Sequence, residues 1–167
     1  MAYATLDRFD RAFTSWLDRH ALTLLRWSLS LVFLWFGVLK LIPGASPAEP
    51  LVAQTTQILF FGLLSERTGV GVVGVWEVLI GLGLLSGVWM RATLALLGLQ
   101  MLGAFSPLVL FPFSTFVQPP FAPTLEGQYI VKNVVLVSAA LVLGSRVREI
   151  DRRRERRVGV GRPASGG

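Results

Sequence analysis

The sequence contains no cysteine and a single histidine, His20. The missing thiols exclude disulfides, thiolate-bound metals and iron–sulfur clusters. One histidine excludes a bis-histidine haem within one chain, and His20 lies in a polar N-terminal segment, where we expect a solvated or interfacial side chain. The sequence therefore predicts no metal site, and its residues identify no catalytic group.

Charge is also scarce, since charged residues make up 16% of the 167 residues and hydrophobic residues 53%. This balance is typical of a protein that lies in a lipid bilayer. Of the 16 lysines and arginines, eight lie at or after Arg146 and four before Trp27. No nucleic-acid-binding motif accompanies these basic ends, so no nucleic acid partner is expected. The arginine tail is expected to contact the anionic cytoplasmic leaflet or to set the topology.

Four apolar segments are long enough to cross the bilayer as helices, and their expected bounds are residues 22–42, 70–88, 92–111 and 128–144. The turn at Arg91 is so short that the second and third must be antiparallel neighbours. The sequence thus predicts an all-α, polytopic membrane protein with four antiparallel transmembrane helices in one bundle, within residues 22–145. Arginines concentrate near both ends and at the turn, so the positive-inside rule places both termini in the cytoplasm. The expected location is the inner, or plasma, membrane, as a multi-pass protein.

The segments outside these spans have distinct compositions. Residues 1–21 lack the order of a signal peptide and are expected to form an amphipathic cytoplasmic lead-in with Phe9, Phe13, Trp16 and Leu17 on one face. Residues 146–167 are expected to form a basic, disordered cytoplasmic tail. Residues 51–65 are apolar but too short to span, so we expect them to lie at the interface or to dip into the bundle. Residues 112–127 combine prolines with phenylalanines, as in an aromatic belt or, less favoured, a lid over a pocket.

Three apolar segments each carry a charged residue fourteen positions from an arginine at the other end. The pairs are Arg26 with Lys40, Glu77 with Arg91, and Lys132 with Arg146. Fourteen helical residues cover about 21 Å, so Lys40, Glu77 and Lys132 share one depth near the extracytoplasmic side if the arginines mark the cytoplasmic face. A charge within a span costs about 2.5–3.5 kcal/mol and usually faces partners inside the protein. These residues are therefore the best site candidates, and we expect Glu77 within bridging distance of one of the two lysines.

Helical spacing adds neighbours to this charged layer. Gly74 and Gly81 share the face of Glu77, as Gly37 shares that of Lys40, and small residues allow close helix approach. Gln100 lies near mid-bilayer, where an interhelical hydrogen bond is favoured over a ligand contact. Core packing is expected for Trp35 and Trp76, although Trp76 remains a ligand-binding candidate beside Glu77. A further small-residue pair, Gly83 and Gly87, offers a seat for a second subunit.

Four sequence stretches resemble the DoxX-like family of small bacterial membrane proteins, near its YkgB-type branch. They are LRWSLSLVFLWFGVLKLIPGASPAEPLV, VWEVLIGLGLLSG, LQMLGAFSPLVLFP and PTLEGQYIVKNVVLVSAALVLG, and together they extend from Arg26 to about Gly144. The resemblance implies a four-helix membrane fold and aligns Lys40, Glu77, Glu126, Lys132 and Asn133 with the family pattern. The family takes its name from a membrane subunit of a thiosulfate:quinone oxidoreductase, and other members are associated with oxidative stress.

Three functions remain open from the sequence. The first is an accessory or quinone-linked subunit of a membrane redox or oxidative-stress system, with a polar site in the outer half of the bundle. Its ligand-binding candidates are Lys40, Glu77, Lys132, Asn133, Glu126, Trp76 and Tyr129; no covalently bound cofactor is expected, and a quinone is the ligand that the resemblance implies. The second is a structural or assembly protein without a ligand, and the third is an oligomeric transporter of a small anion or weak acid. No independent catalytic motif is present, so any enzyme activity is expected to be that of an oxidoreductase subunit. The expected protein partners are a redox partner subunit or further copies of the same chain.

Overall fold

The structure, a computed structural model, describes the backbone of residues 2–160 and the side chains of residues 7 and 9–147. Helices dominate it, in the order α1 (Ala2–Leu41), α2 (Glu49–Leu59), α3 (Glu66–Ser86), α4 (Met90–Phe105), α5 (Pro107–Leu110), α6 (Pro112–Thr115) and α7 (Leu125–Val160). Between α6 and α7, the short strands β1 (Phe116–Gln118) and β2 (Ala122–Pro123) form an antiparallel pair.

Four helical segments are long and apolar enough to cross a membrane, which confirms that prediction and is typical of a multi-pass membrane protein. They are Phe9–Leu41, Glu66–Ser86, Met90–Leu110 and Leu125–Val147. All four begin earlier than expected from hydropathy. The second starts at Glu66 because Ser65 caps it, with its hydroxyl accepting the Thr68 N–H at 3.2 Å. A polar capping residue satisfies helix N–H groups that an apolar run leaves open.

The helix ends follow local backbone chemistry. α1 stops at Leu41, just before Pro43 and Gly44, and Gly44 has a φ of 71°. α3 stops at Gly87, whose φ of 70° is the left-handed conformation that glycine adopts at little cost. The turn that follows is short, so α3 and α4 are antiparallel neighbours, as predicted.

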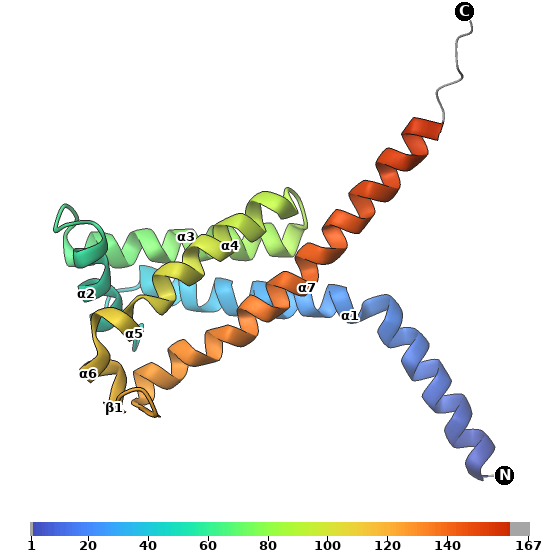
Figure 1. Ribbon diagram of the computed structural model, residues 1–167, viewed down its shortest axis with the longest axis horizontal. Coiled ribbons are helices and arrows are strands. Elements are labelled where there is room, and N and C mark those ends of the chain that lie inside the picture. Colours follow the sequence, from blue (N-terminus) through green and yellow to red (C-terminus); the bar gives the residue numbers. More distant parts are fainter. Residues whose placement is uncertain (1, 161–167) are drawn as a thin grey trace, which may run out of the picture.

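One apolar cluster joins all four long helices. It contains Leu29 and Phe33 of α1, Ile80 and Leu84 of α3, Leu97 and Met101 of α4, and Leu143 of α7. α1 packs along much of α3, and α4 contacts both α3 and α7. In Figure 1, α1 and α3 lie along one another, whereas α4 and α7 cross them obliquely. Of the four spans, α7 is the least buried.

The first turns of α1 and the last turns of α7 lie at the same end of the molecule as the α3–α4 turn (Figure 1). The first part of α1 bends away from the other helices, and Phe9, Phe13 and Trp16 stack along one of its faces. His20 is exposed, with its Nδ1 2.8 Å from the Trp16 carbonyl oxygen.

The tail beyond residue 146 differs from the expected disorder over part of its length. α7 continues as a helix to Val160, and residues 161–167 lie outside the described part of the chain. Arginine and glutamate, which dominate residues 146–157, are good helix formers, so hydropathy alone is a poor guide to where such a helix ends.

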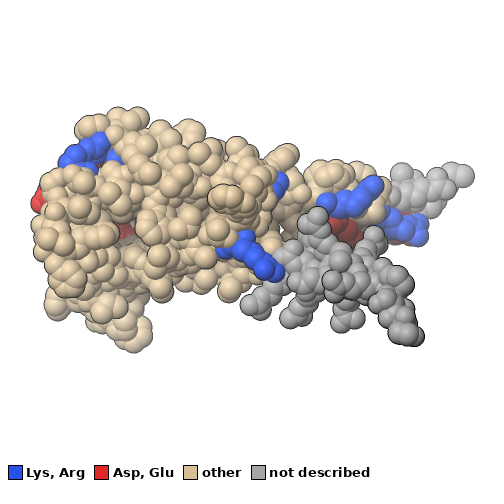
Figure 2. All heavy atoms as spheres, turned by 90° about the horizontal axis from the view of Figure 1, so that it is seen from above, with Lys and Arg blue, Asp and Glu red and all other residues tan. Residues whose placement is uncertain are grey.

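The surface between the two ends is apolar. Figure 2 shows a broad face without charge over the packed helices, with lysine, arginine and acidic side chains gathered toward its ends. The outward residues of the long helices are correspondingly large and hydrophobic, among them Leu79, Leu102 and Leu141. Such a band matches the hydrocarbon region that the spans are long enough to cross.

Candidate functional site

The most buried charged residues of the spans meet between α1 and α3. Lys40, in the last turn of α1, is only 6% exposed, and its Nζ lies 2.6 Å from Oε2 of Glu77 in the middle of α3. This confirms the prediction that Glu77 lies within bridging distance of a lysine. An ammonium group and a carboxylate at this distance form a charge-assisted hydrogen bond, which offsets much of the cost of removing both from water.

Gln100 of α4 completes this cluster from a third helix. Its Nε2 donates to Oε1 of Glu77 at 3.2 Å, so each carboxylate oxygen of Glu77 accepts one side-chain hydrogen bond. The interhelical hydrogen bond expected for Gln100 is therefore confirmed. Lys40, Glu77 and Gln100, the inner cluster, join α1, α3 and α4 at one point.

Glycines bring α1 and α3 close enough for the pair to form. A Cβ atom built on Gly37 would lie 2.9 Å from the Val78 nitrogen and 3.0 Å from the Gly74 carbonyl oxygen. Gly81 is equally tight, since its Cβ would lie 2.6 Å from Cγ of Leu34. The close approach predicted from small residues on the charged faces is thus present, and the helix backbones touch where Lys40 reaches Glu77.

The glycine pair proposed as a seat for a second subunit is used within the chain. A Cβ atom on Gly83 would collide with the Thr93 side chain of α4, and one on Gly87 would collide with the Arg26 guanidinium of α1. Gly83 and Gly87 therefore fit neighbouring helices of the same molecule, which corrects that expectation. The small-residue spacing was visible in the sequence, but the identity of the helix that fills it was not.

A second polar cluster, which the sequence analysis missed, lies at the C-terminal end of α1. Arg67, in the first turn of α3, donates to the carbonyl oxygens of Lys40 (3.1 Å) and Leu41, which end α1. Its guanidinium also lies 3.7 Å from Oε1 of Glu49, at the start of α2. The last carbonyls of a helix have no intrahelical partner, and a guanidinium at this position supplies their hydrogen bonds. Its positive charge also interacts favourably with the negative end of the helix dipole.

The α7 candidates lie apart from the inner cluster. Lys132 is exposed, with its Nζ 5.1 Å from the centre of the Tyr129 ring, and Tyr129 is itself 61% exposed. Glu126 is also exposed, whereas Asn133 is half-buried. Within the described side chains, the one ion pair of Glu77 is with Lys40, so the expected three-residue layer is only partly formed. Depth along each helix was predictable, but the rotation of α7 that turns Lys132 outward was not.

The two tryptophans of interest have different environments. Trp76 packs against the apolar cluster, and its Nε1 donates to the Leu96 carbonyl oxygen of α4 at 3.1 Å. Trp35 is 63% exposed on the outer face of α1, so the expectation of core packing is wrong for Trp35 and right for Trp76. A helix that faces lipid on its outer side carries apolar residues all round, and hydropathy cannot separate its two faces.

The segment 112–127 folds as α6 and the β1–β2 hairpin. Thr115 is fully buried and joins the end of α6 to the residue that precedes α7, because its carbonyl oxygen accepts the Thr124 N–H at 2.9 Å. Phe113 is 86% exposed and Phe121 is similarly exposed, so both rings point outward. Outward rings favour the interfacial belt over a lid that closes on a pocket.

The geometry limits the chemistry of the inner cluster. Lys40 Nζ and Gln100 Nε2 both donate to Glu77, and Lys40 is only 6% exposed, so the cluster presents little surface to a quinone oxygen. The residues present therefore do not fit a quinone head group at this cluster. Within the described part of the chain, no group of three or more histidine, cysteine, aspartate or glutamate side chains is arranged to hold a metal ion.

The chain was compared with protein-family models, with curated proteins and with solved structures. None of these three comparisons gives a match.

Proposed function

We propose that the protein is an accessory subunit of a membrane redox or oxidative-stress system, and that it docks on its partner subunit through the outer half of α7. The observation that carries this proposal is the exposed polar face formed by Glu126, Tyr129 and Lys132. The redox setting rests on the resemblance to DoxX-like proteins, which include a subunit of a quinone-linked enzyme.

The α7 face is unusual for a helix of this hydropathy. Lys132 lies seven residues after Leu125, about 10 Å into the helix, and points away from the other helices. A lysine at that depth is costly against lipid unless its ammonium snorkels to the interface or meets acceptors on another polypeptide. The nearby Tyr129 ring and Glu126 carboxylate add groups that a partner helix would engage.

A partner subunit also explains where redox chemistry takes place in this proposal. Within the inner cluster, Lys40 and Gln100 both donate to Glu77. Lys132 and the half-buried Asn133 are therefore the candidate hydrogen-bond donors to a quinone outside the cluster. A quinone, when bound, accepts electrons and protons, and we place it on the partner subunit or at the α7 interface rather than between α1 and α3.

A structural role without any ligand is the second candidate, and a specific observation favours it. Lys40, Glu77 and Gln100 satisfy one another across three helices, as a purely structural tie would. Under this candidate α7 faces lipid alone, and Lys132 snorkels past Tyr129 to the outer interface.

The experiment is purification in a mild detergent from native membranes, with mass spectrometry of the proteins and quinones that remain bound. We expect a defined partner, or a second copy of the chain, with the wild type and its loss with Tyr129→Ala and Lys132→Leu. Leu102→Ala is the matched control, because Leu102 is a similarly exposed residue that lies on α4 rather than on α7. A protein that stays monomeric and free of partners in the wild type would overturn the docking proposal and leave the structural one.

A further inference from the structure

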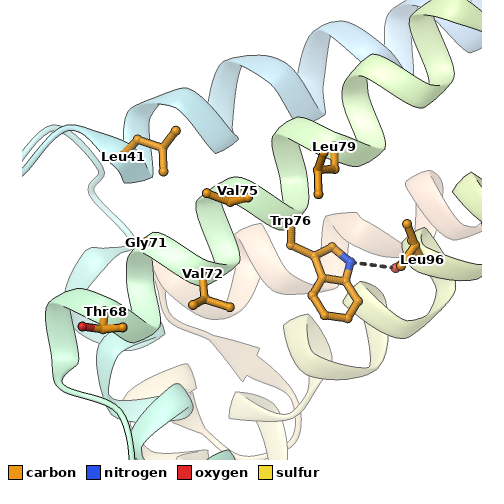
Figure 3. Close-up of a pocket in the computed structure, with 8 residues that line it drawn as sticks. All are labelled: Leu41, Thr68, Gly71, Val72, Val75, Trp76, Leu79 and Leu96. Carbon is orange, nitrogen blue, oxygen red and sulfur yellow. Dashed lines mark hydrogen bonds between the residues drawn. The ribbon is translucent and has the colours of Figure 1, made fainter.

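We infer that the outer face of α3 holds the acyl chain of a zwitterionic phospholipid whose head group carries a phosphate and an ammonium. The site is a groove of about 530 Å³ over α3, shown in Figure 3. It is lined by Leu41 of α1, by Gly71, Val75, Trp76 and Leu79 of α3, and by Leu96 of α4. This groove is separate from the α7 face and independent of the proposed function.

The groove has the shape and polarity of a binding site for a single chain. Its lining is almost wholly apolar, and it follows α3 from Thr68 to Leu79. Eleven helical residues cover about 16 Å, the scale of one extended acyl chain in one leaflet. Gly71 leaves open space in the groove, because a Cβ atom built there would have no atom within 4 Å. The hydrogen bond from Trp76 to Leu96 fixes the indole as the wall on the α4 side.

Polar groups of both signs lie at the mouth of the groove. The Arg67 side chain is 43% exposed beside Leu41, and its links to the α1 carbonyls use two of the five N–H groups of a guanidinium. Thr68, at the top of the groove, adds a hydroxyl. Glu49 lies 3.7 Å from Arg67 and supplies a carboxylate.

This charge pattern selects the head group. Arg67 and Thr68 match a phosphate, since guanidinium groups bind phosphate oxygens through several N–H donors. Glu49 matches an ammonium and disfavours a head group that bears only negative charge. A phosphatidylethanolamine-type lipid satisfies both, with its acyl chain along α3 and its head group at the α1–α2–α3 end of the molecule.

The test is native mass spectrometry of the detergent-purified full chain titrated with dioleoyl phosphatidylethanolamine or dioleoyl phosphatidylglycerol. We expect one tightly retained phosphatidylethanolamine per chain and weaker retention of phosphatidylglycerol. Gly71→Leu should weaken retention about tenfold, because a side chain in the groove leaves at least two methylenes of the lipid unburied. Gly98→Leu is the matched control, since Gly98 of α4 also has no atom within 4 Å of a built Cβ and lies outside the groove.

A second variant tests the head group separately. Glu49→Gln keeps an oxygen that accepts the Gly44 N–H but removes the charge, so it should abolish the preference for phosphatidylethanolamine while leaving chain binding intact. Equal retention of the two lipids by the wild type, or Gly71→Leu that retains lipid as the wild type does, would overturn the inference. A dimer that Gly71→Leu disrupts, with no bound lipid, would assign the groove to a second copy instead.

Discussion

Glu77 has a different partner at each carboxylate oxygen, so its replacement affects two helices at once. Lys40 lies on one side at 2.6 Å and Gln100 on the other at 3.2 Å. Both charged side chains are nearly buried, with side-chain exposures of 8% for Lys40 and 12% for Glu77. A buried charge that loses its partner keeps its desolvation cost and loses the compensating attraction.

Glu77→Gln should therefore destabilise the protein by about 3–5 kcal/mol, because Lys40 would remain buried without a counter-charge. Thermal unfolding in detergent, followed by circular dichroism, measures this loss. Glu126→Gln is the control, since Glu126 is exposed on α7 and should change the midpoint little. An unchanged midpoint for Glu77→Gln would show that the ammonium of Lys40 reaches water by another route.

The double replacement Lys40→Met with Glu77→Gln should be more stable than Glu77→Gln alone. It removes both charges, keeps similar side-chain volumes and leaves an amide that can still accept from Gln100. The same unfolding measurement on wild type, both single variants and the double variant gives the coupling energy. Strict additivity of the two single losses would contradict a direct interaction between the residues.

Gly37→Ala should destabilise the α1–α3 contact by about 1–3 kcal/mol. The added methyl would meet backbone atoms of α3, the Val78 nitrogen at 2.9 Å and the Gly74 oxygen at 3.0 Å, and backbone cannot move aside as a side chain can. Gly98→Ala, at an open position on α4, should be neutral or stabilising through helix propensity. If both variants unfold alike, the contact at Gly37 is looser than the structure indicates.

At the scale of the helices, hydropathy and turn residues were sufficient to locate the four spans. Pro43 and Gly44 mark the end of α1, and Gly87 marks the end of α3. The inner cluster was half predictable, because equal depth along the helices brings Lys40 level with Glu77. The rotation of each helix was not predictable in a chain that is apolar all round, which is why Lys132 and Trp35 face outward.

Arg67 shows a different limit of the sequence. By charge alone it is a cation on the side of the membrane where the positive-inside rule expects few. Its role becomes clear only when the end of α1 is placed beside the start of α3, where its guanidinium binds two backbone carbonyls. Contacts between a side chain and the backbone of another helix have no sequence signature.

The hairpin segment 113–121 should show the same protease sensitivity with and without added quinones. Its rings Phe113 and Phe121 are exposed and point outward, as side chains of an interfacial belt do. Limited proteolysis followed by mass spectrometry of the fragments provides the measurement. Protection of this segment by a quinone, but not by an equal concentration of a saturated lipid, would favour the interpretation of the segment as a lid.

At the scale of the whole molecule, the start of α1, the end of α7 and the α3–α4 turn lie at one end of the structure (Figure 1). Arginines mark this end in the sequence, at Arg26, Arg91 and Arg146. The arrangement supports a topology in which all three regions share one side of the membrane, and the positive-inside rule proposes the cytoplasm for that side.

Reporter fusions should accordingly give a cytoplasmic signal at the C-terminus and at the α3–α4 turn, and an extracytoplasmic signal within the α2–α3 connection. Paired fusions to a periplasm-active phosphatase and a cytoplasm-active fluorescent protein measure each position. The opposite pattern would invert the molecule and place the Arg67 cluster in the cytoplasm.

The tie between α1 and α3 also has a consequence for biogenesis. Lys40 and Glu77 are 37 residues apart in the chain, so at about 5–20 residues per second the ribosome adds the carboxylate about 2–7 s after the ammonium. Lys40 therefore reaches the membrane before its counter-charge, and we expect its ammonium to depend on water until the next long helix brings Glu77 beside it.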